Sequence, residues 1–289
     1  MAVASQRGAA GAQPAPFELS LLRELVEERC GAHFPESRER LLTRALAQRA
    51  TALSLAGYSD YYHHLRRSPR ADEEWQALAE LLVNGETGFF RHQPSFEALA
   101  RHVLPELARE RLGSGVRALA AWSAGCATGQ EAYSLAMVLL DGVPGPSWQV
   151  KVSGTDLSQA ALDRARRGRY RAAEVEALPA ACRDRHFRPV EGVPAACEVG
   201  PALRAAVEFG RLNLARPADY RLGSQDVIFC QNVLLYFRSE RRPAVVGALA
   251  GRLKPGGYLF LAPGEVVGLK LPGLAAARLP DTLAYRRTG

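Results

Sequence analysis

Glycines and polar residues stand where apolar runs of the sequence end. Residues 122–131 pass from an apolar run through Gly125 and Gly129 to Glu131, where a helical pattern begins. Glycines at such a turn permit a tight bend and let a ligand approach the backbone closely. Taken alone, the segment is explained equally well as an ordinary connection between a strand and a helix.

An acidic residue ends the next strand-like run. Residues 148–154 have strand character, and Asp156 follows them after Thr155. A carboxylate at the tip of the second strand can accept hydrogen bonds from both hydroxyls of a ribose. It can also cap the helix that we expect from about Ser158, and the two roles are compatible.

The type of ligand follows from the loop. Dinucleotide cofactors carry a pyrophosphate that is usually bound by a G-x-G-x-x-G loop, and this chain lacks that pattern there. Glu131 instead directs an anion towards the ligand, which suits a molecule with an ammonium and a sulfonium, as in S-adenosylmethionine. Asn213 and Asn232 follow two further strands, so we expect them near the adenine and near the methionine portion, respectively.

The elements that must position these residues fall into two regions with different secondary-structure patterns. Residues 17–113 are predicted to form an all-helical domain and linker, because their apolar residues recur at helical spacing. In residues 114–289 strands alternate with helices, which favours an α/β fold with a largely parallel sheet. The prolines and glycines of residues 170–206 interrupt that alternation and indicate a small inserted subdomain, while residues 1–16 are predicted to be a disordered tail.

Composition narrows the class of protein. The tail lacks the apolar stretch of a secretory signal, and the five cysteines are scattered without a CxxC pair, so we expect a cytoplasmic protein with reduced thiols. We expect no metal site, no membrane insertion and a monomer. The net charge of +7 is compatible with nucleic acid, anionic lipid or an acidic protein as partner, and does not choose between them.

Five motifs in order resemble the CheR family, the chemoreceptor glutamate methyltransferases. They are the specific stretch G-E-T-G-F-F-R at residues 85–91, the glycine loop, G-T-D at 154–156, the pair Asn213 and Leu214, and residues 229–237. The resemblance implies a Rossmann-like class I methyltransferase sheet with a helical N-terminal domain. It also implies that S-adenosylmethionine is contacted by Thr87, Arg91, Glu131, Asp156, Asn213, Leu214, Asn232 and Val233, with Arg91 suited to the methionine carboxylate.

This chain departs from the pattern at three positions. Gly85 stands where some members have Asn, and Gln130 and Gln231 stand where members often have Glu and Arg. None removes a group that we regard as essential, but each is expected to alter cofactor affinity. In some members the inserted subdomain holds a peptide tether of the receptor; the compact segment here favours action without one.

The implied reaction moves a methyl group from S-adenosylmethionine to receptor glutamates in the cytoplasm, in chemotaxis-type signalling. A glutamate is ionised at neutral pH, so no general base is required. Tyr236 can orient the acceptor or simply pack under the sheet edge. A basic face with Arg38, Arg40, Arg44 and Arg49 is either a docking surface for an acidic receptor helix or an ordinary solvated helix face, which Glu36 and Glu39 partly offset. The alternatives are a cofactor-binding signalling scaffold and methylation of nucleic acid; against the latter, aromatic-rich basic stretches are lacking, so we expect no nucleic-acid partner.

Overall fold

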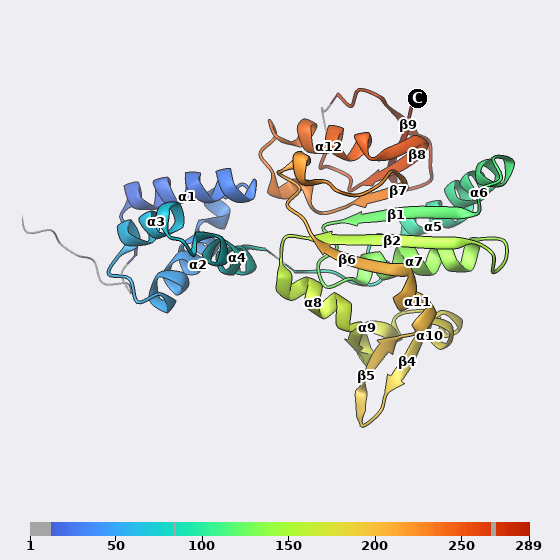
Figure 1. The fold of residues 1–289 in the computed structure, drawn as a ribbon, viewed down its shortest axis with the longest axis horizontal. Helices are drawn as coiled ribbons and strands as arrows, with labels where there is room; N and C mark the ends of the chain where they lie inside the picture. Colours follow the sequence, from blue (N-terminus) through green and yellow to red (C-terminus); the bar gives the residue numbers. More distant parts are fainter. Residues whose placement is uncertain (1–12, 84, 267–269) are drawn as a thin grey trace, which may run out of the picture. The chain divides into compact units, whose positions relative to one another are not determined.

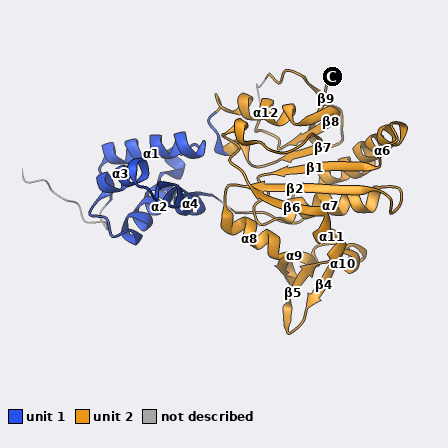
Figure 2. Cartoon of the chain, in the orientation of Figure 1, with its two compact units in different colours: residues 1–84, 236–238 blue, residues 85–235, 239–289 orange. Residues whose placement is uncertain are grey.

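The chain divides into two compact units. The computed structural model describes residues 13–83, 85–266 and 270–289 (Figure 1). Unit 1 comprises residues 1–84 and 236–238, and unit 2 comprises residues 85–235 and 239–289 (Figure 2). Residues 1–12 of the predicted tail lie outside the described residues, and the first helix begins at Pro16. None of the described helices combines the length and the apolar character that crossing a membrane requires.

Unit 1 is helical, as its sequence pattern predicts. Its elements are α1 (Pro16–Cys30), the short η1 (Glu36–Arg38), α2 (Glu39–Ala52), α3 (Tyr58–Arg67) and α4 (Ala71–Leu82). The apolar faces of these helices meet in a common core that includes Leu22, Leu42, Leu46, Tyr61 and Leu78. Burial of those side chains, each worth about 2 kcal/mol, supplies the main stabilisation of this unit.

Two buried carboxylates complete unit 1. Glu74 accepts both Nε and Nη2 of Arg49, at 2.9 and 2.7 Å, and the hydroxyl of Tyr61 at 2.7 Å. Glu27 accepts the backbone amide of Phe34 at 2.7 Å and is paired with Arg238. The second pair fastens residues 236–238, which are far away in sequence, to α1.

A seven-stranded sheet organises unit 2. In spatial order its strands are β6 (Val207–Arg211), β2 (Gln149–Asp156), β1 (Ala118–Ala124), β7 (Gln225–Cys230), β8 (Leu253–Leu261), β10 (Leu283–Arg287) and β9 (Leu274–Ala277). The first five run parallel, whereas β10 is antiparallel to both of its neighbours. The order reverses between β1 and β7, which is where parallel α/β sheets bind their ligands. The predicted α/β fold is confirmed.

Helices cover this sheet, and three of them precede it in the sequence. α7 (Gln130–Gly142) packs on β1 and β2, α8 (Gln159–Arg167) on β2 and β6, and α12 (Arg242–Gly251) on β8. α5 (Gln93–Ala98), η2 (Leu99–Val103) and α6 (Leu104–Gly113) also belong to this core, because Phe96, Leu99 and Leu107 are buried against its apolar residues. The division between the units therefore lies at residue 84, whereas the sequence pattern predicted that the helical domain and its linker end near residue 113.

The inserted segment forms a small sheet of its own. β3 (Arg169–Arg171), β5 (Val193–Val199) and β4 (Phe187–Val190) pair antiparallel in that spatial order. The short helices α9 (Ala172–Glu176), α10 (Ala180–His186) and α11 (Pro201–Ala206) accompany the strands. An antiparallel hairpin needs only short connections, so a compact subdomain fits between α8 and β6.

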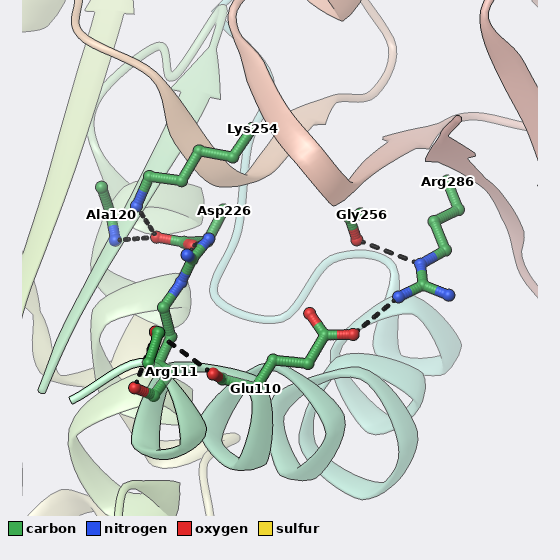
Figure 3. Close-up of polar contacts among 8 residues, drawn as sticks. Glu110, Arg111, Ala120, Asp226, Lys254, Gly256 and Arg286 are labelled. Carbon is green, nitrogen blue, oxygen red and sulfur yellow. Dashed lines mark hydrogen bonds and ion pairs between the residues drawn. The ribbon is translucent and has the colours of Figure 1, made fainter. Parts of the chain in front are cut away.

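An ionic cluster fixes the start of β7 (Figure 3). Asp226 is buried, and its carboxylate accepts Nε of Arg111 at 2.8 Å, Nζ of Lys254 at 2.7 Å and the backbone amide of Ala120 at 2.8 Å. One side chain thus joins α6, β1, β7 and β8. Its three partners leave the buried carboxylate fully compensated, which is the condition for tolerating a charge in the core.

Candidate active site

The glycine loop between β1 and α7 has a backbone that only glycine adopts readily. Gly125 has φ +91°, and a Cβ built there would lie 2.4 Å from Cγ2 of Val233. Gly129 has φ +97°, and its Cβ would lie 2.7 Å from the Cβ of Ala165. Both glycines are therefore required by conformation and by close contact. The loop consequently lies directly against the segment that follows β7.

Asp156 joins this loop to the end of β2. One carboxylate oxygen accepts the backbone amide of Ala127 at 2.9 Å, and the other accepts the backbone amide of Ser158 at 2.9 Å. Ser158 is the N-cap of α8 and accepts the amide of Ala161 at 3.0 Å. Asp156 thus supports the start of α8 as well as the loop, while contact with a ribose remains a prediction.

Glu131 lies in the first turn of α7 and faces the end of β1. Its carboxylate accepts the hydroxyl of Ser123 at 2.6 Å. Burial raises the pKa of Glu131 to about 7; the nearby carboxylate of Glu265 raises it further, and the Ser123 hydrogen bond and Arg91 oppose the rise. An enclosed carboxylate that holds its negative charge weakly at neutral pH suits a cationic ligand, because the ligand would restore full ionisation.

The G-E-T-G-F-F-R stretch at residues 85–91 is tied to the same helix. The backbone amide of Phe90 donates to the hydroxyl of Ser134 at 3.0 Å. The ring of Phe89 contacts those of Tyr170 and Phe187 edge-on. Nη1 of Arg91 donates to the carbonyl of Glu86 at 2.7 Å. These contacts bring Arg91 into the electrostatic range of Glu131; Thr87 is half-buried in the same stretch.

Two further predicted residue pairs follow β6 and β7. Asn213 accepts the amide of Ala215 at 2.9 Å, and the carbonyl of the buried Leu214 accepts the hydroxyl of Tyr220 at 2.8 Å. Asn232 adopts the left-handed region with φ 59°, a conformation that asparagine tolerates better than most residues. Both pairs follow the carboxyl ends of parallel strands, which is the edge of the sheet where α/β proteins bind their ligands.

Two of the departures from the family pattern have structural partners. Gln231 is buried, and its Nε2 donates to the hydroxyl of Ser95 at 2.8 Å. Gln130 is also buried; it accepts the hydroxyl of Thr128 at 2.7 Å and donates to Glu174 at 3.1 Å. These glutamines hold the loop and the end of β7 in place, so this chain uses neutral groups at both positions.

The four predicted docking arginines differ in their surroundings. Arg40 and Arg44 on α2 are exposed, and neither forms an ion pair with any residue in the described ranges. Arg49 is turned inward to Glu74. Arg38 belongs to η1, and its guanidinium lies 4.8 Å from the ring centre of Tyr236. The geometry thus leaves Arg40 and Arg44 available to a partner, and gives Arg49 a structural contact.

One residue of this region was not predicted from the sequence. Glu265 follows β8 by four positions and is buried, and it accepts backbone amides of Leu235 at 3.1 Å and Ala262 at 3.2 Å. No local pattern distinguishes it from a glutamate in an exposed turn, since its partners come from two separate strand ends.

Comparison with known proteins identifies the family. Residues 85–275 match the CheR methyltransferase, SAM binding domain, and residues 18–83 match the CheR methyltransferase, all-alpha domain. This chain belongs to the CheR methyltransferase family. CheR membership confirms the resemblance carried by the five motifs and makes the chain an S-adenosylmethionine-dependent methyltransferase. The boundary between the two matched regions coincides with the division between units 1 and 2.

Individual CheR relatives match over most of the chain. Chemotaxis protein methyltransferase 2 of Pseudomonas aeruginosa is 33% identical over 246 residues, covering 84% of each protein. The chemotaxis protein methyltransferase of Escherichia coli is 32% identical, covering 84% of this chain and 82% of that protein. The probable biofilm formation methyltransferase WspC of P. aeruginosa is 36% identical over 91% of this chain, which spans 60% of that longer protein.

The residues present fit S-adenosylmethionine. A Cβ at Gly125 would fill the space between the loop and Val233, and Glu131 supplies an enclosed anion for a ligand with a net positive charge. No G-x-G-x-x-G loop is present to bind a pyrophosphate. The cofactor prediction is therefore consistent with both the backbone and the charge of this site.

Proposed function

We propose that this CheR protein methylates glutamate side chains on the cytoplasmic helices of bacterial chemoreceptors, forming methyl esters. The single observation that carries the acceptor class is the exposed pair Arg40 and Arg44, one turn apart on α2 and unpaired among the described residues. A receptor helix with several glutamates is an acidic surface, which such a basic face attracts. The names of the relatives, which refer to chemotaxis and to biofilm formation, support a receptor of the chemotaxis type.

S-adenosylmethionine supplies an electrophilic methyl group when bound. We propose that Asp156 binds the ribose hydroxyls, that Asn213 and Leu214 receive the adenine, and that Arg91 binds the methionine carboxylate through its planar fork. Thr87, Gly125, Glu131, Asn232 and Val233 complete the proposed contacts. The close approach of Val233 to Gly125 supports a narrow site that excludes water.

The acceptor brings its own reactivity. Its carboxylate is ionised at neutral pH because the reference pKa of glutamate is about 4.3, so the protein needs to align the oxygen and remove its water rather than accept a proton. We propose that the hydroxyl of Tyr236 orients that carboxylate. The guanidinium of Arg38 lies 4.8 Å from the ring centre of Tyr236 and holds that ring in one orientation.

Transfer of labelled methyl from S-adenosylmethionine to a chemoreceptor cytoplasmic fragment tests the proposal. We expect label on the receptor that mild base releases as methanol, because methyl esters are base-labile and N-methyl groups are not. Asp156→Ala should abolish labelling, and Glu191→Gln, a substitution in the exposed hairpin of the inserted subdomain, should not.

Three results would count against this proposal. Cofactor binding without receptor labelling would favour a signalling scaffold or another acceptor. Base-stable label would place the methyl group on an atom other than a carboxylate oxygen, and labelling of nucleic acid would replace the acceptor altogether.

A further inference from the structure

Tyr170 belongs to the inserted subdomain, but its side chain reaches the glycine loop. It lies at the middle of β3 and is 2% exposed. Its hydroxyl donates to the backbone carbonyl of Thr128 at 2.8 Å. Thr128 lies within the loop that joins β1 to α7. A residue of the subdomain is therefore hydrogen-bonded to the backbone around which the proposed cofactor contacts are arranged.

The glycine at position 129 makes room for this hydroxyl. A Cβ at Gly129 would lie 3.0 Å from the hydroxyl oxygen of Tyr170, which is closer than ordinary van der Waals contact. Burial raises the pKa of Tyr170 above its ordinary value, so the hydroxyl stays protonated and remains a donor at neutral pH. The loop and the tyrosine thus fit each other both in space and in hydrogen bonding.

The glycine loop also contains a residue that needs support from both sides. Ala127 has φ +47°, in the left-handed region that costs free energy for a residue with a Cβ. Such a conformation persists where the surrounding structure imposes it. The amide of Ala127 donates to Asp156 at 2.9 Å, and the carbonyl of the next residue, Thr128, accepts the hydroxyl of Tyr170. Asp156 and Tyr170 therefore hold the loop on the two sides of Ala127.

The ring of Tyr170 packs on the G-E-T-G-F-F-R stretch. Its centre lies 4.9 Å from that of Phe89, and the two rings meet edge-on at 75°. Aromatic pairs favour this arrangement, so the contact restricts the orientation of Phe89. Phe89 lies between Thr87 and Arg91, which are both proposed cofactor contacts. One side chain therefore contacts two segments of the site that are separate in the sequence.

We propose that Tyr170 is a positioning residue for S-adenosylmethionine, whose hydroxyl holds the glycine loop and whose ring holds residues 85–91. The inserted subdomain is thereby part of the support of the cofactor site. This inference rests on the proposed cofactor contacts and not on the proposed acceptor. If receptor labelling failed while the cofactor bound normally, the acceptor proposal would fall and this one would not.

Calorimetric binding of S-adenosylmethionine to the full chain, without receptor, tests the hydroxyl. Tyr170→Phe keeps the ring and removes the donor, so we expect the dissociation constant to rise about fivefold. Tyr258→Phe is the matched control, because Tyr258 is also buried and its hydroxyl donates to Glu106 of α6 at 2.8 Å. We expect the control to lose stability in a denaturant titration while its dissociation constant stays unchanged.

A residue that only stabilises the fold changes the free energy of unfolding and leaves the affinity of the folded protein as it was. A wild-type dissociation constant in Tyr170→Phe would therefore overturn the role of the hydroxyl, even if that variant were less stable. An equal rise in Tyr258→Phe would also overturn it, since the effect would then follow from the loss of any buried hydroxyl.

A double-mutant cycle tests the ring. Tyr170→Leu removes the ring and the hydroxyl together, so we expect the dissociation constant to rise about twentyfold. The extra loss of Tyr170→Leu over Tyr170→Phe should vanish in a Phe89→Leu background, because the ring then has no aromatic partner in residues 85–91. Full additivity would overturn the proposed support of that stretch. Tyr170→Phe carries the test if Tyr170→Leu does not fold.

Discussion

Burial raises the pKa of Glu131 to about 7, so its charge changes across the neutral range in the ligand-free protein. A cationic cofactor binds the ionised form and lowers that pKa, so protonation competes with binding. We predict that the dissociation constant of S-adenosylmethionine rises about tenfold between about pH 7.5 and about pH 6. Titration calorimetry in buffers of constant ionic strength measures this effect.

Glu131→Gln provides the control for that pH dependence. The amide has no charge to lose, so binding should be weaker than in the wild type at about pH 7.5 and nearly independent of pH. A wild-type slope in this variant would mean that another group, such as Glu265, titrates instead.

The raised pKa of Glu131 also affects folding: Glu131 favours the folded state at low pH, and that contribution to the free energy of unfolding is lost as pH rises through about 7.

A substitution at Gly125 tests whether cofactor binding depends on the backbone conformation of the glycine loop. Alanine there must adopt φ +91° and place a Cβ 2.4 Å from Val233, so the loop or the turn has to move. We predict that Gly125→Ala weakens cofactor binding by more than about tenfold, corresponding to strain above about 1.4 kcal/mol. Gly247→Ala is the matched control, because its Cβ meets nothing within 4 Å and alanine favours the helix α12. Equal binding by both variants would show that the loop tolerates a side chain.

At the scale of elements, Asp226 connects β7 to α6, β1 and β8. Asp226→Asn would leave the partly buried Arg111 and Lys254 without their counter-charge. We predict a loss of about 3 kcal/mol in the free energy of unfolding, measured by denaturant titration. Glu110→Gln removes a half-exposed partner of Arg286 and should cost less than about 1 kcal/mol. Similar losses in the two variants would refute a special role for the cluster.

The elements of this fold were largely predictable because their signals are local. The apolar run at residues 119–122 and the strand-like segment 226–230 lie in β1 and β7, and the helical pattern from about residue 35 to residue 53 corresponds to η1 and α2. Helix ends were less certain: Ser59 is a good capping residue, but α3 begins at Tyr58 after Gly57. The membership of α5 and α6 in the sheet domain depends on packing against residues further along the chain, and helical periodicity does not report it.

The residues of the site divide in the same way. Strand-end positions such as Asp156, Asn213 and Asn232 could be predicted because the sheet topology itself brings strand ends together. Glu265 could not be, since its partners lie at the ends of two different strands. Arg49 shows the opposite difficulty: it shares α2 with Arg44, but only the fold reveals that it faces the buried Glu74.

Arg49 therefore gives a prediction that separates support of α2 from docking. Arg49→Ala leaves the carboxylate of Glu74, whose side chain is 4% exposed, without its paired guanidinium, although the hydroxyl of Tyr61 still donates to it. We predict that it lowers the free energy of unfolding of the helical unit by about 3 kcal/mol. Hydrogen exchange of the amides of α2 and α4 measures this locally. A fully stable variant with impaired receptor methylation would instead return Arg49 to the docking surface.

At the scale of the whole molecule, the formal net charge of +7 acts on any acidic partner from a distance. A general attraction of this kind depends on total charge, whereas docking depends on where the charges lie. The helical unit carries exposed arginines on more than one helix, including Arg44 on α2 and Arg67 on α3. Equal changes of charge at these two positions therefore distinguish steering by the whole chain from contact with one face.

We predict that Arg44→Glu lowers kcat/KM for a chemoreceptor fragment about tenfold, whereas Arg67→Glu lowers it less than about twofold. Each substitution changes the net charge equally, so the difference measures the contribution of the α2 face. The affinity for S-adenosylmethionine, measured without receptor, should be the same in both variants because neither residue is among the proposed cofactor contacts. The effect of Arg44→Glu should also shrink as salt is raised, since exposed charges are screened within about 10 Å at moderate ionic strength. Equal losses in the two variants would mean that net charge alone attracts the receptor, and α2 would then have no special part in docking.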